Sequence, residues 1–265
     1  GSDIGQIALE KAGILKSGVC CVVARQESSA LEVLEARARE LDAPLLAHGQ
    51  AWDAFEQHGR LIFQTATSLL DLPLPRLPGR HQIDNAGTAL AAIHALAGET
   101  IANAALSAGL KSARWPARLQ NLTGSVLQTH VAEGSQIWLD GGHNASAAEA
   151  LAHAMAEMEE RTPQPLHLIC GMMTGKDAGG FLRQFNGLAE WAATIPVPAK
   201  DKTYGADELA AIARDAGLDA HPAQGLTQAL EASRTRADGP VRILICGSLY
   251  LSGQVLGALE SENPG

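Results

Sequence analysis

Several features are missing from the 265-residue sequence, and each absence excludes a class of protein. No apolar run is long enough to cross a membrane, and we expect no signal peptide at the start. The four cysteines lack metal-ligand spacing, so we interpret them as reduced core residues of a cytoplasmic protein. Aromatic residues are scarce, which favours helix-on-sheet packing over a β-sandwich.

An excess of positive charge is also missing, because the formal net charge is −9 at pH 7. This balance argues against nucleic acid or an anionic membrane as the main partner. Neither G-x-x-x-x-G-K-[ST] nor G-x-G-x-x-G after a strand occurs in the sequence. If a nucleotide binds, its phosphates must therefore be held by other groups.

The second half of the chain alternates apolar strands with helical patterns, which predicts an α/β fold with a mostly parallel sheet. The expected strands are residues 126–131, 136–139, 166–170, 192–197 and 242–246. We expect the first two to form a hairpin that turns at Glu133-Gly134-Ser135. A capping box of Ser146 and Glu149 predicts the start of the helix that follows the second strand.

The first half is less regular. The pattern predicts helices near residues 7–15, 29–41, 83–96 and 101–110, strands at 19–24 and 44–47, and a two-stranded excursion around 59–65. Pro116 is expected to end the helical region, and a new β-rich unit begins after it. We therefore predict two domains, residues 1–118 and 119–265.

Polar residues follow several of the predicted strands of the second half, where a parallel sheet gathers its ligands. Asp140 and His143 follow one strand, Lys176 lies after the next, and Ser248 follows the last. Backbone N–H groups at a helix start attract anions, so His143 stands where a carboxylate or phosphate could bind. The alternatives are structural: a turn residue, an exposed loop side chain, or, for Ser248, a helix cap.

Three residues of the first domain can likewise be interpreted either as ligand-binding or as structural residues. Lys11 lies on an otherwise apolar helix, Asn85 lies one turn inside another helix, and Arg118 stands between the domains. An asparagine amide suits an adenine edge, and an arginine suits a phosphate. Each could equally be a solvated surface residue or, for Arg118, a contact between domains.

Six segments, in this order, resemble the Mur ligase superfamily and within it the folylpolyglutamate synthases and bifunctional dihydrofolate synthases. They are IALEKAGILKSG at Ile7–Gly18, GRHQIDNAGTALAA at Gly79–Ala92, RWPARLQ at Arg114–Gln120, LDGGHNASAAEAL at Leu139–Leu151, GMMTGKD at Gly171–Asp177 and CGSLYLSG at Cys246–Gly253. The resemblance implies a C-terminal Rossmann-like domain, residues 119–265, that acts as the glutamate ligase domain. It implies that residues 1–118 are the C-terminal part of a P-loop-type ATP-binding domain.

Enzymes of this family use ATP to join L-glutamate to a folate or pteroate carboxylate through an acyl phosphate. The resemblance thus implies a cytoplasmic, monomeric ligase of folate biosynthesis and one-carbon metabolism, with small-molecule substrates, no nucleic acid and no membrane. ATP and Mg²⁺ are the implied cofactors, with a monovalent cation as a further candidate. The implied reaction is tetrahydrofolate polyglutamylation, with or without conversion of dihydropteroate to dihydrofolate.

The same resemblance implies roles for residues in the first domain and the link. Lys11 matches the family's carbamylated lysine, which supports Mg²⁺, and its apolar helix suits a lysine held neutral. Asn85 matches the adenine contact, and Arg118 matches the arginine that reaches the ATP phosphates.

In the second domain, Asp140 matches the aspartate that contacts the nucleotide. His143, as a catalytic residue, and Ser248 match residues beside the incoming glutamate. Lys176 lies in a segment that we assign to the glutamate or phosphate. The glycines of the tip are expected to give these ligands clearance.

One departure from the family pattern matters, because relatives carry a P-loop and further metal-binding residues upstream of the E-K-A-G-I segment. Without the P-loop, we expect the 265-residue chain to be inactive alone. Two alternatives stay open: a non-catalytic module that binds glutamate or a partner, and another Mur-type amino-acid ligase.

Overall fold

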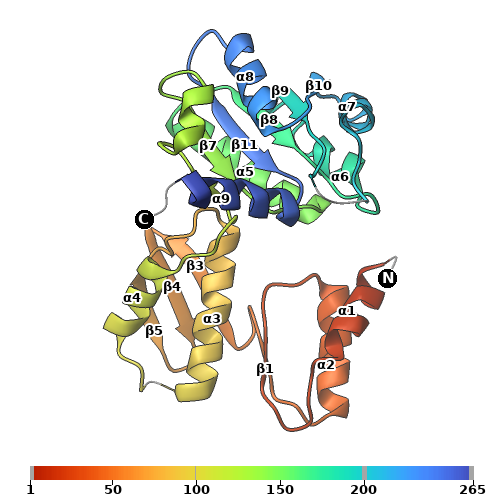
Figure 1. The fold of residues 1–265 in the computed structure, drawn as a ribbon. Helices are drawn as coiled ribbons and strands as arrows, with labels where there is room; N and C mark the ends of the chain where they lie inside the picture. The colour runs from red at the N-terminus through yellow and green to blue at the C-terminus, as the bar shows by residue number, and fades with distance from the viewer. Residues whose placement is uncertain (1–2, 99, 199–201, 263–265) are drawn as a thin grey trace. The chain divides into compact units, whose positions relative to one another are not determined.

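The computed structural model describes residues 3–98, 100–198 and 202–262. The chain divides into two compact units, Gly1–Arg114 and Trp115–Gly265 (Figure 1). Each unit has its own buried apolar clusters.

The first unit contains two small sheets with their own helices. Its elements are α1 (Ile4–Ala12), β1 (Cys21–Val23), α2 (Ser28–Glu40), β2 (Leu45–Ala47), β3 (Trp52–Gln57), β4 (Arg60–Thr65), β5 (Leu69–Pro73), α3 (His81–Ala97) and α4 (Asn103–Ser112). Strands β1 and β2 pair in parallel, whereas β3, β4 and β5 form an antiparallel sheet. The expected two-stranded excursion therefore has a third strand, whose Pro73 is tolerated because β5 is an edge strand.

The second unit contains a six-stranded sheet in the order β10-β9-β8-β11-β7-β6. Its strands are β6 (Gln120–Asn121), β7 (Gln136–Leu139), β8 (Leu166–Cys170), β9 (Ala189–Thr194), β10 (Ala220–Pro222) and β11 (Arg242–Cys246). All neighbouring strands pair in parallel except β6 and β7. The prediction of an α/β fold with a mostly parallel sheet is confirmed.

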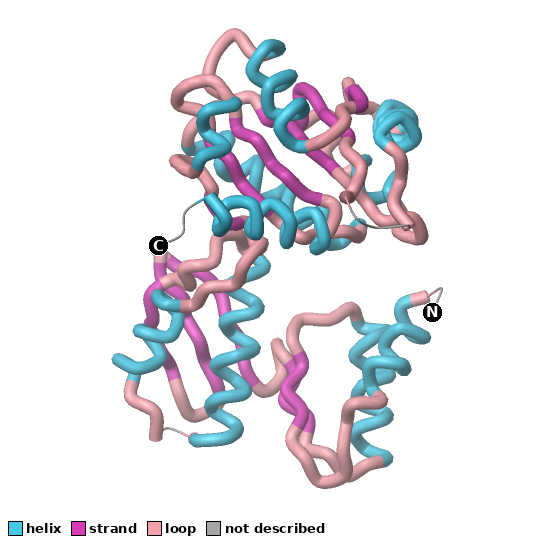
Figure 2. Tube along the Cα trace, in the orientation of Figure 1, coloured by secondary structure: helices cyan, strands magenta, loops and turns pink. Residues whose placement is uncertain are grey.

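Helices cover both faces of this sheet, as Figure 2 shows. They are α5 (Ala145–Arg161), α6 (Ala178–Arg183), α7 (Ala206–Asp215), α8 (Leu226–Arg236) and α9 (Leu249–Glu262). Successive strand residues alternate between two apolar clusters: Leu168 packs with α5, α6 and α7, and Ile169 packs with α8 and α9. Burial on both faces explains why these strands are continuous apolar runs rather than alternating ones.

The expected strand at residues 126–131 is wrong. Val126–His130 forms a 3₁₀ helix, η1, in which the Thr129 hydroxyl donates to the carbonyl of Val126 at 2.8 Å. Strand β6 pairs with β7 instead. The connection between these two strands is therefore longer than the expected turn at Glu133–Ser135. Local bonds of polar side chains compete with a sheet ladder, and here they hold the helical turn.

The predicted capping box at the start of α5 is also wrong. Asn144 is the cap, and its side-chain oxygen accepts the N–H of Ala147 at 2.8 Å. The helix therefore begins at Ala145, one residue before Ser146. The tip between β7 and α5 consists of residues 140–144.

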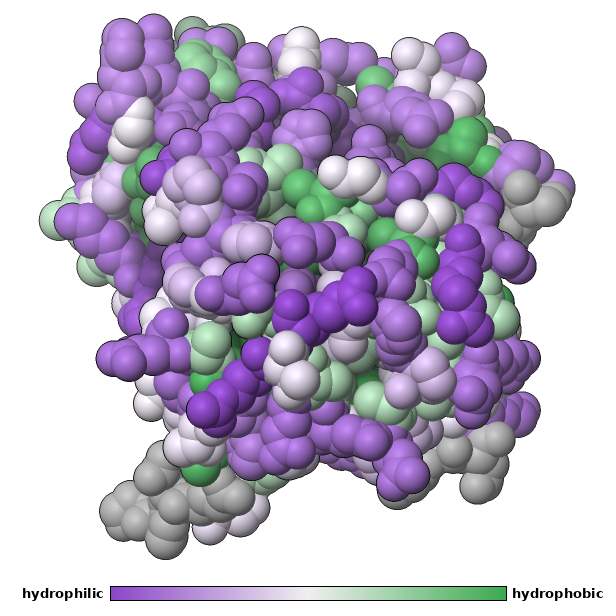
Figure 3. Space-filling model, turned by 90° about the horizontal axis from the view of Figure 1, so that it is seen from above, coloured by the Kyte–Doolittle hydropathy of each residue, from purple (hydrophilic) through white to green (hydrophobic). Residues whose placement is uncertain are grey.

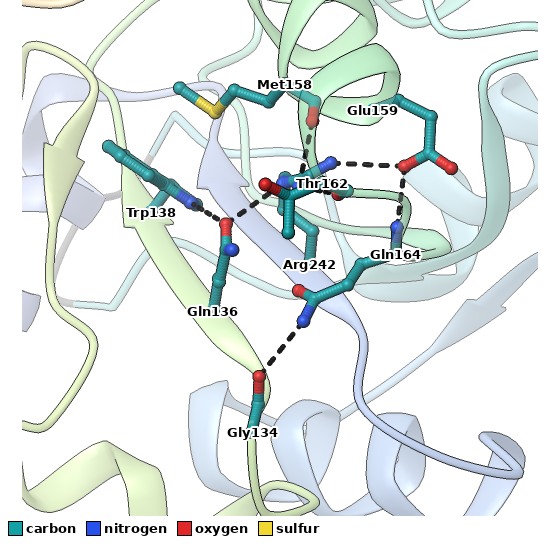
Figure 4. Close-up of polar contacts among 8 residues, drawn as sticks. All are labelled: Gly134, Gln136, Trp138, Met158, Glu159, Thr162, Gln164 and Arg242. Carbon is teal, nitrogen blue, oxygen red and sulfur yellow. Dashed lines mark hydrogen bonds and ion pairs between the residues drawn. The ribbon is translucent and has the colours of Figure 1, made fainter.

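A buried arginine connects strands and helix at the amino edge of the second unit's sheet (Figure 4). Arg242 is only 1% exposed, and its guanidinium donates to Glu159 and Gln136 at 3.2 and 3.1 Å. It also donates to the carbonyls of Met158 and Thr162 at 3.3 and 2.7 Å, at the end of α5. Burial lowers the pKa of Arg242, and the Glu159 carboxylate opposes that shift. The network thus places positive charge where the helix dipole favours it.

A buried histidine makes the stability of this unit depend on pH. His167, 1% exposed on β8, shares a 2.7 Å hydrogen bond with the hydroxyl of Ser233. Burial, and secondarily the charge of Arg236, lowers its pKa from 6.5 to about 4. Because the unfolded chain takes up this proton first, stability falls as the pH drops from 6.5 through 4, by about 3 kcal/mol.

We therefore expect His167→Gln to remove this component from the pH dependence of the free energy of unfolding, measured by urea denaturation between pH 7 and pH 4. His221→Gln is the matched control, because the His221 side chain is 50% exposed and should leave the component intact. An identical pH dependence in wild type and His167→Gln would contradict the assignment.

Hydrophilic residues cover most of the face drawn in Figure 3, with separate hydrophobic patches between them. Within the described residues, no helix combines the length and apolar character that a membrane span needs.

Candidate active site

Three loops of the second unit meet at the carboxyl edge of neighbouring strands β7, β11 and β8. Backbone hydrogen bonds join them: Gly247 N–H donates to the carbonyl of Gly142 at 3.0 Å, and Gly171 N–H donates to that of Cys246 at 3.2 Å. Strand β11 is the last strand in sequence but lies between β7 and β8. The helix that follows β7, α5, and the helix that follows β11, α9, therefore leave this edge toward opposite faces of the sheet. Ligands of open parallel sheets bind at such points.

The glycines of these loops serve packing between loops. A Cβ on Gly141 would lie 2.3 Å from the Cδ2 of Leu249 in α9. Gly247 has φ +100°, and a Cβ there would lie 2.8 Å from the Sγ of Cys170. The expectation that the tip glycines, Gly141 and Gly142, serve ligand clearance therefore needs correction: protein atoms take the space at Gly141, and a Cβ on Gly142 would lie 3.0 Å from the Oδ1 of Asp140.

Two thiols lie beneath the loops. Cys170 and Cys246 are paired residues of β8 and β11, and both are fully buried and free. Burial, and then the Cys170 side chain, raises the pKa of Cys246 well above its ordinary value. A buried thiol with a raised pKa is an inert core residue.

Asp140, the first residue after β7, is buried, with 4% exposure. Its Oδ2 accepts the N–H of Leu119 at 2.7 Å, and its Oδ1 accepts the N–H of Gly142 at 2.6 Å. The backbone carbonyl of Asp140 accepts the hydroxyl of Ser252 at 3.2 Å. The aspartate thus joins the tip to the segment that enters the unit and, through Ser252, to α9.

Arg118 lies in that entering segment, between two residues with left-handed backbone. Ala117 has φ 55° and Leu119 has φ 42°, each of which costs about 1–2 kcal/mol for a non-glycine residue. The segment is held by Gly141 N–H to the carbonyl of Ala117 at 2.9 Å and by Ala117 N–H to Gln120 Oε1 at 2.9 Å. Arg118 is half-buried, and no ion pair or hydrogen bond joins its guanidinium to another described residue.

His143 is half-buried just before the first turn of α5. Its Nδ1 lies 3.0 Å from the carbonyl oxygen of Gly141. A carbonyl only accepts, so Nδ1 carries the proton, and in the neutral ring Nε2 is left as an acceptor. The tip therefore fixes which nitrogen of His143 is available to a ligand.

Ser248 and Lys176 occupy the other two loops. Ser248 is 2% exposed, and its Oγ accepts the N–H of Tyr250 at 3.2 Å, the structural cap expected as one alternative. Lys176 is exposed, and its backbone carbonyl accepts the hydroxyl of Tyr204 at 3.2 Å. The edge thus brings Asp140, His143, Lys176 and Ser248 to adjoining loops, with Arg118 beside Asp140.

Asn85 lies on the first unit, in the second turn of α3, and is exposed. Its Nδ2 donates to Gln82 Oε1 at 3.1 Å, and Gln82 Nε2 lies 2.9 Å from His81 Nε2. Gln82 is buried, with 5% exposure, so it fixes how the Asn85 amide is turned. Sequence reasoning missed Gln82 and Ser252; spacing of three and four residues from Asn85 and Ser248 was the available signal.

Lys11 lies in the last turn of α1 and is exposed. The described residues therefore do not surround Lys11 with apolar groups, contrary to the expectation from its apolar helix. No group of three or more His, Cys, Asp or Glu side chains in the described ranges is arranged to hold a metal ion. Lys11 as a magnesium support stays a prediction.

A mostly parallel sheet, covered on both faces and carrying its polar loops at one carboxyl edge, defines a Rossmann-like α/β domain. Residues 123–258 match the family described as "Dihydrofolate synthetase, C-terminal domain". The chain belongs to the dihydrofolate synthetase and folylpolyglutamate synthase family.

Similar proteins carry consistent names. The chain is 33% identical over 165 residues to the dihydrofolate synthase/folylpolyglutamate synthase of Bacillus subtilis (strain 168), which covers 59% of this chain and 36% of the relative. Its fold matches E. coli FolC in complex with DHPP and ADP, with a TM-score of 0.82, 26% identity, and coverage of 99% of this chain and 58% of that one. It also matches the bifunctional folylpolyglutamate synthase/dihydrofolate synthase from Yersinia pestis complexed with AMPPNP and Mn ion, with a TM-score of 0.82, 26% identity, and coverage of 98% and 58%.

The chain therefore spans between about a third and three fifths of the length of these relatives. The similarity covers both units, because it extends over nearly all of this chain in the two solved structures.

Proposed function

We propose that this chain is part of an ATP-dependent ligase that adds L-glutamate to a folate or pteroate carboxylate through an acyl phosphate. In this proposal, residues 1–118 belong to the ATP-binding domain and residues 119–265 form the glutamate ligase domain. The observation that carries the proposal is the carboxyl edge of β7, β11 and β8, where His143 presents one defined nitrogen beside a helix start. The relatives that bind ADP, AMPPNP and DHPP support it.

The chemistry asked of these residues is neutralisation and positioning. Glutamate attacks as a neutral amine, so its ammonium group must lose a proton, and in this proposal the Nε2 of His143 accepts it; the contact of Nδ1 with the carbonyl of Gly141 supports this role. The start of α5 and Lys176 supply positive potential for the carboxylates of glutamate. Ser248 caps α9 and holds the backbone of the third loop.

Arg118 neutralises charge on the transferring phosphoryl group, and Asn85 contacts the adenine. Gln82 accepts a hydrogen bond from the Asn85 Nδ2 and so fixes the orientation of this amide. The Asn85 Oδ1 is then left to accept an N–H from the exocyclic amino group of adenine. A divalent cation would screen the phosphates when bound, but the described side chains do not form a ligand set for it. No step here depends on it.

We expect the full-length protein that contains this chain to incorporate labelled glutamate into tetrahydrofolate or dihydropteroate, with release of ADP. The 265-residue chain alone should give neither product, because it carries no P-loop motif. Supplying each acceptor separately decides between polyglutamylation alone and a bifunctional enzyme. Glutamate binding without ATP-dependent incorporation in the full-length protein would contradict the proposal and favour a binding module.

A further inference from the structure

We propose that Asp140 is a positioning residue that acts through Arg118, by holding the segment around this arginine in its strained backbone conformation. This inference rests on the proposed function for the role of Arg118 at the phosphates. It assigns Asp140 a task different from direct contact with the nucleotide.

The first support is the direction of the carboxylate. Asp140 is 4% exposed, and each of its oxygens accepts a backbone N–H, one from Leu119 and one from Gly142. The bond to Leu119 joins residues 21 positions apart, so it ties the entering segment to the sheet. Charge-assisted bonds of this kind are stronger than neutral ones.

The second support is the backbone on either side of Arg118. Ala117 and Leu119 both adopt positive φ, which non-glycine residues adopt only where the surroundings enforce it. Two bonds from the loop after β7 enforce it here: Gly141 N–H to the carbonyl of Ala117, and Leu119 N–H to Asp140. Both bonds flank Arg118, so they fix the direction in which its side chain leaves the backbone.

The third support is the contrast between the two side chains. The Asp140 carboxylate faces the backbone, whereas the half-buried Arg118 guanidinium makes no ion pair or hydrogen bond in the part of the chain that is described. A cation whose backbone is held by several hydrogen bonds, and which has no counter-ion among the described residues, is pre-organised for an anionic ligand. Phosphate oxygens of the nucleotide are that ligand in the proposed function.

A double-mutant cycle in the full-length protein tests the inference, with ATP-analogue affinity and kcat/KM for ATP as readouts. Asp140→Asn should weaken affinity about tenfold to hundredfold, because an amide nitrogen cannot accept one of the two N–H groups. Arg118→Ala should weaken it at least as much. Asp140→Asn should cause no further loss in the Arg118→Ala background, since a residue acting through Arg118 has nothing left to position.

Glu159→Gln is the matched control. Glu159 also accepts a backbone N–H, that of Gln164 at 2.9 Å, but it lies in the Arg242 network at the other edge of the sheet. Glu159→Gln should lower stability without changing nucleotide affinity, and that contrast separates positioning from general destabilisation.

Hydrogen exchange of the Leu119 and Gly142 amides in the 265-residue chain tests the clamp independently of catalysis. Asp140→Asn should accelerate both, whereas unchanged protection would overturn the inference. Additive losses in the cycle would also overturn it, because they would show direct contact of Asp140 with the nucleotide. If Arg118→Ala leaves affinity unchanged, the proposed role of Arg118 fails while the exchange result still decides whether Asp140 holds the segment.

Discussion

His143→Ala is expected to lower the rate of glutamate ligation by the full-length protein about a hundredfold or more. The reason is the fixed tautomer: Nδ1–H donates to Gly141, so Nε2 is the acceptor presented beside the start of α5. Alanine removes the only imidazole of the three edge loops, and with it the proton acceptor proposed for the glutamate ammonium. The effect should appear in kcat with glutamate and less in the affinity for ATP.

His153→Ala is the matched control for this variant, because His153 is an exposed histidine of α5, the helix that follows the tip. We expect it to keep wild-type ligation. Thermal unfolding of both variants should match wild type, since the His143 ring is half-buried and makes one side-chain hydrogen bond among the described residues. Unchanged ligation by His143→Ala would show that the tip is only a structural turn.

Arg242→Met is expected to destabilise the second unit by about 1–3 kcal/mol, the cost of leaving a buried acceptor without its donor, because the partner Glu159 is 43% exposed and is not left as a buried unpaired charge. The side chain is 1% exposed, and its removal takes the guanidinium donor from the carbonyl of Thr162, while the carbonyl of Met158 keeps the N–H of Thr162 at 2.9 Å. Methionine fills much of the volume, so the loss reports hydrogen bonds and charge rather than a cavity. Native-state hydrogen exchange of the β11 amides measures this loss where the network lies.

Two further variants calibrate that result. Arg236→Met removes an arginine that is 54% exposed and pairs with Asp219, so it should cost less than about 1 kcal/mol. Arg242→Lys keeps the charge but not the planar set of donors, so it should fall between the two. A loss from Arg242→Met no larger than that from Arg236→Met would show that the buried network adds no stability.

The sequence by itself determined the architecture of the second unit. Continuous apolar runs alternating with helical patterns predicted a mostly parallel sheet, and the structure has it because both faces of the sheet are covered. Because parallel strands end at one edge, the sequence also predicted that the loops with Asp140, His143, Lys176 and Ser248 would share that edge. The ordered motifs were sufficient to identify the family.

Local patterns were weaker where several bonding partners competed. Residues 126–131 are apolar enough for a strand, yet side-chain bonds to nearby backbone stabilise a 3₁₀ helix. Asn144, rather than the Ser146 and Glu149 pair, caps α5, because its position in the tip places its oxygen by the Ala147 N–H.

Only the tertiary structure decided what Asp140 and the tip glycines touch. Asp140 bonds to Leu119, 21 residues away, and the space beside Gly141 is filled by Leu249 from the last helix. Such partners come together through the order β8-β11-β7, which inserts the last strand between two earlier ones. Residue type and spacing show that an aspartate can bind a ligand; its burial and bond directions, which follow from packing of distant segments, are the observations behind its proposed role as a support for Arg118.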